Sequence, residues 1–158
     1  MDKLWAPWRI NYIQGIDKKK KTKCIFCHSL KSKKENYIFL KGKYSFAILN
    51  IFPYNNGHVM IAPIRHTGDI KKLNEKEVAD MFKTLQKVIK KLDKALKPQG
   101  YNLGMNVGKC AGAGVPGHLH LHVVPRWDAD TNFMPITAGT KVISQSLNQL
   151  YKILKSDA

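Results

Sequence analysis

The sequence lacks the features that mark secreted, membrane-spanning and repetitive proteins. It has no run of about 18 or more apolar residues, so no transmembrane helix is expected. Residues 1–10 contain no apolar segment of a signal peptide, and three cysteines are too few for a disulfide framework. No internal repeat and no recognised nucleic-acid-binding motif is present. These absences predict a cytoplasmic protein without a membrane partner, for which nucleic acid is an unfavoured ligand.

Acidic residues are scarce beside basic ones. The chain has 11 Asp and Glu against 27 Lys and Arg, which gives a formal net charge of +16. Such a balance attracts polyanions, including nucleotides. Most of the excess is lysine, in runs such as residues 18–21, which favours a solvated basic surface over a dedicated anion groove. The charge alone therefore identifies no partner.

The residues that are present fit a single α+β domain over residues 1–158, with an irregular N-terminal segment at 1–23. Apolar residues make up 44% of the chain, which is enough for a core. Three short apolar stretches separated by turn residues predict an antiparallel meander, and two further strands are expected near the triple-histidine motif. The five predicted strands are residues 37–40, 45–49, 58–61, 101–107 and 119–124.

Two amphipathic helices complete the prediction. Residues 74–96 carry apolar side chains at three- and four-residue spacing, which indicates a long helix with one buried stripe. Asn74 is a suitable N-cap, and Glu77 three residues later completes a capping box. Residues 141–154 predict a second, C-terminal helix. Strands on both sides of one long helix in the sequence favour an α+β fold over a doubly wound sheet.

The most informative stretch is a glycine-rich loop that leads into His118, His120 and His122. Alternate residues of a strand share a face, so the three imidazoles are expected to project together. Three imidazoles on one face are costly to bury and are rarely needed for packing. The loop over residues 108–117 contains four glycines, and its backbone N–H groups can form an anion-binding nest. The combination predicts a functional site that binds phosphate.

The segment His118-Leu-His120-Leu-His122-Val-Val resembles the signature of the histidine triad superfamily. Other segments are similar to its bacterial branch, which includes diadenosine-tetraphosphate phosphorylases and hydrolases; they are Leu4–Arg9, Cys24–Cys27, Ser45–Asn50, Gly57–His58, Pro125–Trp127 and Asn132–Met134. The resemblance implies an antiparallel α+β fold, usually as a homodimer. It also implies cleavage at the α-phosphate of dinucleoside polyphosphates or nucleotide conjugates.

The resemblance makes His120 the nucleophile of a covalent nucleotidyl-histidine intermediate. The chemistry agrees, because a neutral imidazole is nucleophilic at one nitrogen when its other N–H is held by a hydrogen bond. His122 would donate to the phosphate, and Asn106 would bind the leaving phosphate. The resemblance also implies nucleotide contacts at Asn50 (ribose), His58 (phosphates) and the backbone of Gly112, Gly114 and Val115.

Two of these positions carry alternatives. His58 is equally well explained as a histidine whose hydrogen bonds are satisfied at the end of a strand. Many family members have Ser, Thr or Gln near residues 114–115, where this chain has Gly114 and Val115. Help to the leaving group from a side chain at that point is therefore in question.

Cys24-x-x-Cys27 has half of the ligand spacing of a zinc site. In relatives that carry this pair, and in the related uridylyltransferases, a Cys2His2 set binds structural zinc, which implies His66 and His118 as the other ligands here. Two reduced thiols in a loop are the alternative, and His28 is a competing ligand. Cys110 is expected to be an ordinary loop cysteine.

The leading interpretation is a nucleotidyl hydrolase or transferase. A phosphorylase with phosphate as acceptor, a non-catalytic nucleotide-binding module, a metal centre on three histidines and a basic nucleic-acid binder are the alternatives. The intact His120 argues against a module that only binds, and the glycine-rich loop argues against a metal triad. The sequence decides neither the exact substrate nor whether water or phosphate is the acceptor.

Overall fold

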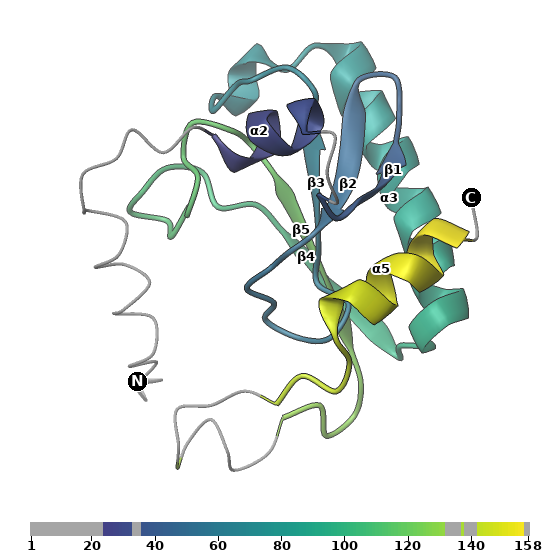
Figure 1. Cartoon of the computed structure of the whole chain (residues 1–158). Coiled ribbons are helices and arrows are strands. Elements are labelled where there is room, and N and C mark those ends of the chain that lie inside the picture. Colours follow the sequence, from purple (N-terminus) through teal and green to yellow (C-terminus); the bar gives the residue numbers. More distant parts are fainter. Residues whose placement is uncertain (1–23, 33–35, 132–136, 138–141, 157–158) are drawn as a thin grey trace.

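The structure is a computed structural model that describes residues 24–32, 36–131, 137 and 142–156. Figure 1 shows its elements. In chain order these are α2 (Ile25–Lys31), β1 (Ile38–Lys41), β2 (Ser45–Leu49), β3 (Val59–Pro63), the 3-10 helix η1 (Ile70–Lys72), α3 (Glu75–Leu96), β4 (Gly100–Gly104), β5 (Leu121–Arg126) and α5 (Leu147–Ser156). The expected irregular segment 1–23 and the motif at 132–134 lie outside the described residues.

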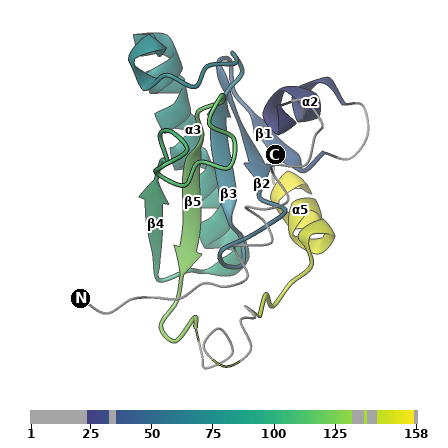
Figure 2. The same cartoon turned by 90° about the vertical axis from the view of Figure 1, so that its left-hand side faces the viewer.

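The five strands form one antiparallel sheet in the order β1-β2-β3-β5-β4. The predicted meander is confirmed as β1, β2 and β3, whose inner pair runs in register from Leu49 opposite Val59 to Ser45 opposite Pro63. The chain then passes through α3 to the far edge at β4 and returns as β5 between β4 and β3 (Figure 2). The expectation of an α+β fold with an antiparallel sheet is confirmed.

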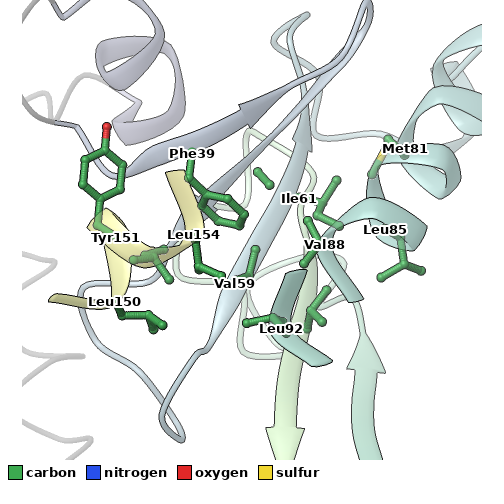
Figure 3. Close-up of a cluster of buried hydrophobic side chains, with 13 residues drawn as sticks. Phe39, Val59, Ile61, Met81, Leu85, Val88, Leu92, Leu150, Tyr151 and Leu154 are labelled. Atoms are coloured by element: carbon green, nitrogen blue, oxygen red, sulfur yellow. The ribbon is translucent and has the colours of Figure 1, made fainter. Parts of the chain in front are cut away.

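Every residue of β2 and β3 is buried, because helices cover both faces of the sheet. On one face α3 and α5 pack against alternate strand residues (Figures 1 and 3). On the other face α2 covers a smaller cluster, in which Phe26 packs against Phe46, Ile48, Met60 and Ala62. Each large side chain buried in this way contributes roughly 1.5–3 kcal/mol to stability. The larger cluster consists of Phe39, Ala47, Leu49, Val59, Ile61, Met81, Leu85, Val88, Leu92, Val123, Leu150, Tyr151 and Leu154.

The long helix begins as the sequence predicts. The Asn74 side chain accepts from the Glu77 N–H at 3.0 Å, and the Glu77 carboxylate accepts from the Asn74 N–H at 3.0 Å. Glu77 also accepts two hydrogen bonds from Arg65, which joins the first turn of α3 to the loop after β3. Lys97, in the left-handed conformation, ends the helix. No described helix is long and apolar enough to cross a membrane.

Several element boundaries differ from those predicted. The strand expected over 119–124 begins at Leu121, because the Leu119 N–H bonds to the carbonyl of Thr67 in a loop. The strand expected over 101–107 ends at Gly104, since the chain turns into the glycine-rich loop. The C-terminal helix begins at Leu147, where Ser146 and Gln149 exchange capping hydrogen bonds, and not at 141. The short helix α2 was not predicted.

Candidate functional site

The three histidines of the motif lie on the face of the sheet that α2 covers. His122 is in β5, opposite Met60 of β3, while His118 and His120 lie in the segment that leads into the strand. The rings of His120 and His122 have centroids 4.8 Å apart. His118 is wholly buried and His120 is 5% exposed, whereas Val123 points into the α3 side of the core.

His120 has one ring nitrogen that is hydrogen bonded to the backbone. Its Nδ1 lies 2.9 Å from the carbonyl oxygen of His118. A carbonyl can only accept, so Nδ1 carries the proton and Nε2 keeps a free lone pair. Burial lowers the pKa of His120 below its ordinary value, against an opposing effect of this hydrogen bond. The ring is therefore neutral at pH 7 and nucleophilic at Nε2.

His122 is bonded to a second histidine through an ordered chain of donors. The backbone N–H of Tyr54 donates to His58 Nδ1 at 3.0 Å, and the side-chain amide of Asn50 lies 3.2 Å from the same nitrogen. The proton of neutral His58 is therefore on Nε2, which lies 2.9 Å from His122 Nδ1. His122 Nδ1 accepts this hydrogen bond, so His122 carries its proton on Nε2 and can donate it to an anion.

The surroundings of His58 and His122 keep both of these hydrogen-bonded imidazoles neutral. Burial, followed by the nearby imidazoles of His122 and His120, lowers the pKa of His58 to about 3. Burial and the neighbouring His120 lower the pKa of His122 to about 4. Tyr54 covers both rings, with its centroid 4.6 Å from that of His58 and 5.7 Å from that of His122.

The glycine-rich loop is folded on itself and anchored to the sheet. Gly108 and Gly112 have φ values of +89° and +86°, which favour glycine. The N–H of Gly112 bonds to the carbonyl of Lys109, whereas within the described part of the chain the N–H groups of Gly114 and Val115 have no partner. The Val115 side chain packs against the cluster of Phe26, so this part of the loop lies beside that cluster.

The loop also fits closely against the segment after β3. A Cβ at Gly68 would lie 2.4 Å from the carbonyl oxygen of Pro116, a separation that real side chains do not reach. Gly68 therefore allows the glycine-rich loop to pack against the segment after β3. A hydrogen bond of 2.7 Å from the Leu119 N–H to the carbonyl of Thr67 joins the same two segments.

Asn50 and Asn106 both hold parts of the site in place. The side-chain oxygen Oδ1 of Asn50 accepts from the Phe52 N–H at 2.9 Å, and the residue is 9% exposed. The Asn106 amide donates to the carbonyl of Gly112 at 3.3 Å, which closes the base of the loop. The expected contacts of these two residues with ribose and leaving phosphate stay predictions.

Cys24, Cys27, His66 and His118 come together as the sequence analysis expected, and their ligand atoms all lie within 4.8 Å of one another. His118 Nδ1 is 3.2 Å from the sulfur of Cys24 and 3.2 Å from His66 Nδ1, while Cys27 Sγ is 3.4 Å from His66 Nδ1. His118 Nε2 donates to the Pro63 carbonyl at 2.8 Å, which leaves Nδ1 free to ligate. The group can hold a metal ion.

Two site residues were missed by the sequence analysis. Phe26 is wholly buried in α2, with its ring centroid 4.9 Å from that of His120. Tyr54, the cover of the His58–His122 pair, is 47% exposed. Phe26 had a weak signal, because it is an apolar residue between two cysteines. Tyr54 had none, since the loop that carries it has no periodicity.

Comparisons with known proteins agree with this geometry. The family model of the HIT domain matches residues 31–129. The chain is 34% identical to an AP-4-A phosphorylase of Mycobacterium tuberculosis over 99% of this chain and 84% of the relative. It is 30% identical to an adenosine 5′-monophosphoramidase of Saccharomyces cerevisiae over 83% of this chain and 80% of the relative. A crystal structure of a Zn-bound histidine triad family protein from Mycobacterium smegmatis superposes with a TM-score of 0.69 at 25% identity, covering 87% of this chain and 94% of the other.

Proposed function

The chain belongs to the HIT domain family, and on this premise we propose that it is a nucleotidyl hydrolase or transferase that cleaves dinucleoside polyphosphates or nucleotide conjugates at the α-phosphate. The observation that carries the proposal is the state of His120. Its Nδ1–H is fixed on the carbonyl of His118, so Nε2 is the nucleophilic nitrogen of a buried ring.

The first step transfers the nucleotidyl group to the protein. The lone pair of His120 Nε2 forms a bond to the α-phosphorus, and the P–O bond to the leaving group breaks with its electrons passing to that oxygen. A polyphosphate leaves as an anion and needs no proton. The substituted ring is then positively charged, which strengthens its Nδ1–H hydrogen bond to the His118 carbonyl.

The hydrogen bonds within the site indicate which N–H groups can donate to the substrate phosphate. His122 Nε2–H is set to donate to a non-bridging oxygen, because its Nδ1 accepts from His58. The N–H groups of Gly114 and Val115 are suited to the same charge, which increases on the phosphoryl oxygens during transfer. In the second step an oxygen of the acceptor attacks phosphorus, the P–N bond breaks, and its electrons return to Nε2.

The acceptor distinguishes two versions of this function. Water would give hydrolysis, with the proton that it loses passing to solvent, and inorganic phosphate would give phosphorolysis. The similarity to an AP-4-A phosphorylase over nearly the whole chain supports phosphate. The similarity to a phosphoramidase supports water and a smaller leaving group.

A panel of dinucleoside polyphosphates and nucleoside phosphoramidates, incubated with and without phosphate, tests the proposal by mass spectrometry. Diadenosine tetraphosphate gives AMP and ATP by hydrolysis, but ADP and ATP by phosphorolysis. His120→Asn should abolish turnover and keep nucleotide binding, while His28→Asn, which changes an exposed histidine of α2, serves as control. Normal turnover by His120→Asn would refute the mechanism.

We propose zinc as the metal of the Cys24, Cys27, His66 and His118 group. Zn–S bonds of about 2.3 Å and Zn–N bonds of about 2.0–2.1 Å in a tetrahedron separate neighbouring donor atoms by about 3.3–3.8 Å. Four of the separations here are 3.2, 3.2, 3.4 and 3.6 Å, and all the ligand atoms lie within 4.8 Å of one another. The ion would join α2 to the loops that carry the two histidines. Reduced thiols are typical of cytoplasmic proteins, and we propose the cytoplasm as the location of this protein.

We further propose that the chain forms a homodimer through the free edge of β4. Among the described residues, this strand pairs only with β5, and open space surrounds the positions where Gly100 and Gly104 would carry a Cβ. Leu103 on the edge strand is 48% exposed, and Phe82 on α3 is 59% exposed. Pairing of two such edges would satisfy the outward N–H and C=O groups and cover apolar surface.

A further inference from the structure

Phe26 of α2 is a buried core residue that also contacts the histidine motif. It lies between Cys24 and Cys27 in α2, and none of its surface is exposed. Its ring contacts two members of the histidine motif, with centroid separations of 5.0 Å to His118 and 4.9 Å to His120 and interplanar angles of 51° and 41°. Both separations lie within the range of favourable aromatic pairs, about 4.5–7 Å.

Besides the ring of His122, whose centroid lies 4.8 Å away, two groups contact different parts of the His120 ring. The carbonyl of His118 holds Nδ1, which fixes the tautomer but leaves the ring able to tilt about this single hydrogen bond. The ring of Phe26 limits that tilt, because the two rings pack 4.9 Å apart, with Phe26 wholly buried and His120 5% exposed. The direction of the Nε2 lone pair thus depends on Phe26 as well as on the carbonyl.

The turn that carries Phe26 is itself held in place. Cys24 and Cys27, on either side of it, face the ligand atoms of His66 and His118. The N–H of His28 closes this turn on the carbonyl of Cys24 at 2.9 Å. The turn that carries Cys24 and Cys27 therefore contacts His120 through the ring of Phe26.

We propose that Phe26 is a positioning residue for His120, which holds the imidazole so that Nε2 points to the substrate phosphorus. The inference rests on the proposed role of His120 as nucleophile. A displacement of about 1 Å of a reacting group can cost roughly 100-fold in rate. Substitution of Phe26 is therefore expected to slow the chemical step more than it weakens binding.

Phe46 offers a matched control. It is also wholly buried and belongs to the same cluster, where it meets Phe26 edge-on at 6.3 Å, but it makes no ring contact with a histidine among the described residues. Phe26→Leu and Phe46→Leu remove the same atoms from the same cluster. Their losses of thermal stability should be similar, so a difference in catalysis isolates the contact with His120.

The experiment measures kcat, KM, melting temperature and metal content for both variants, together with the long-range ¹H–¹⁵N spectrum of histidine-labelled protein. For Phe26→Leu we expect kcat to fall roughly 100-fold with KM changed less than about threefold. Its His120 ring signals should split or broaden, as expected for a ring with two orientations and one tautomer. Phe46→Leu should keep one His120 state and a kcat within about threefold of the parent protein.

Equal losses of kcat in the two variants would overturn the proposal, and so would an unaltered His120 spectrum and kcat in Phe26→Leu. If Phe26→Leu does not fold, Phe26→Met, which keeps the volume on a flexible chain, replaces it with the same criteria. The spectrum is recorded without substrate. A failure of the proposed function, seen as normal turnover by His120→Asn, is therefore distinguishable from a failure of the Phe26 assignment.

Discussion

The buried neutral state of His58 predicts a measurable sensitivity of the fold to acid. Its pKa is about 3 in the folded protein and about 6.5 in an unfolded chain. Between these two values the unfolded state binds more protons, so the free energy of unfolding falls as the pH falls. The stabilisation is complete above pH 6.5 and is lost towards pH 3.

The size of the effect follows from the pKa difference. Each pH unit within the window costs about 1.4 kcal/mol, which amounts to about 2.6 kcal/mol for His58 between pH 7.5 and pH 4.5. For a domain of this length that corresponds to a melting temperature lower by roughly 5–10 °C. His122, with a pKa of about 4, adds to the loss in the same direction.

Comparison with His58→Gln isolates the contribution of His58. Glutamine can offer an amide N–H to His122 Nδ1 but does not titrate, so the variant should lose less stability on acidification by roughly 5–10 °C. Cys24, Cys27, His66 and His118 are unchanged in the variant, so their response to acid cancels when the shifts in melting temperature of the two proteins are compared. Melting curves of the two proteins that shift in parallel from pH 7.5 to 4.5 would refute the assignment of a buried, neutral His58.

Three further predictions follow from the site and the proposed assembly. A substrate with a chiral thiophosphate at the α-position should react with retention of configuration, because two in-line displacements occur at phosphorus, whereas inversion would remove the covalent intermediate on His120. Purified protein should contain about one zinc per chain by elemental analysis, and Cys24→Ser should lower the melting temperature more than it weakens nucleotide binding, since structural zinc contributes to folding; absence of zinc with titratable thiols would contradict the site. Leu103→Lys should shift the protein from dimer to monomer in light scattering, because it places a charge on the free edge of β4, and an unchanged mass would exclude that edge as the interface.

The parts of the fold that the sequence predicts are those that depend on local pattern. The apolar spacing of α3 and its Asn74–Glu77 capping box are decided within one helix, and the structure confirms both. The three strands of the meander follow from short apolar runs between turns. The common face of the three histidines follows from the two-residue period of extended chain, which holds even where His118 and His120 precede the strand proper.

The parts that could not be predicted depend on contacts between distant segments. The helix α2 has seven residues and no periodic apolar stripe, and it is stabilised by burial of Phe26 against strands far along the chain. The pairing of His58 with His122 could not be found either, because the two residues are 64 positions apart in the sequence. Spacing within the sequence places a histidine on a face but does not say which of its nitrogens is free.

That choice of nitrogen separates the three histidines of one face into three kinds of chemistry. His118 donates from Nε2 to the carbonyl of Pro63, so its Nδ1 is free beside two sulfurs and can bind a metal. His120 donates from Nδ1 to the carbonyl of His118, so its Nε2 is free to attack phosphorus. His122 accepts at Nδ1 from His58, so its Nε2 carries a proton to give to phosphate. The proposed roles of metal ligand, nucleophile and phosphate donor thus each depend on the partner of the opposite ring nitrogen.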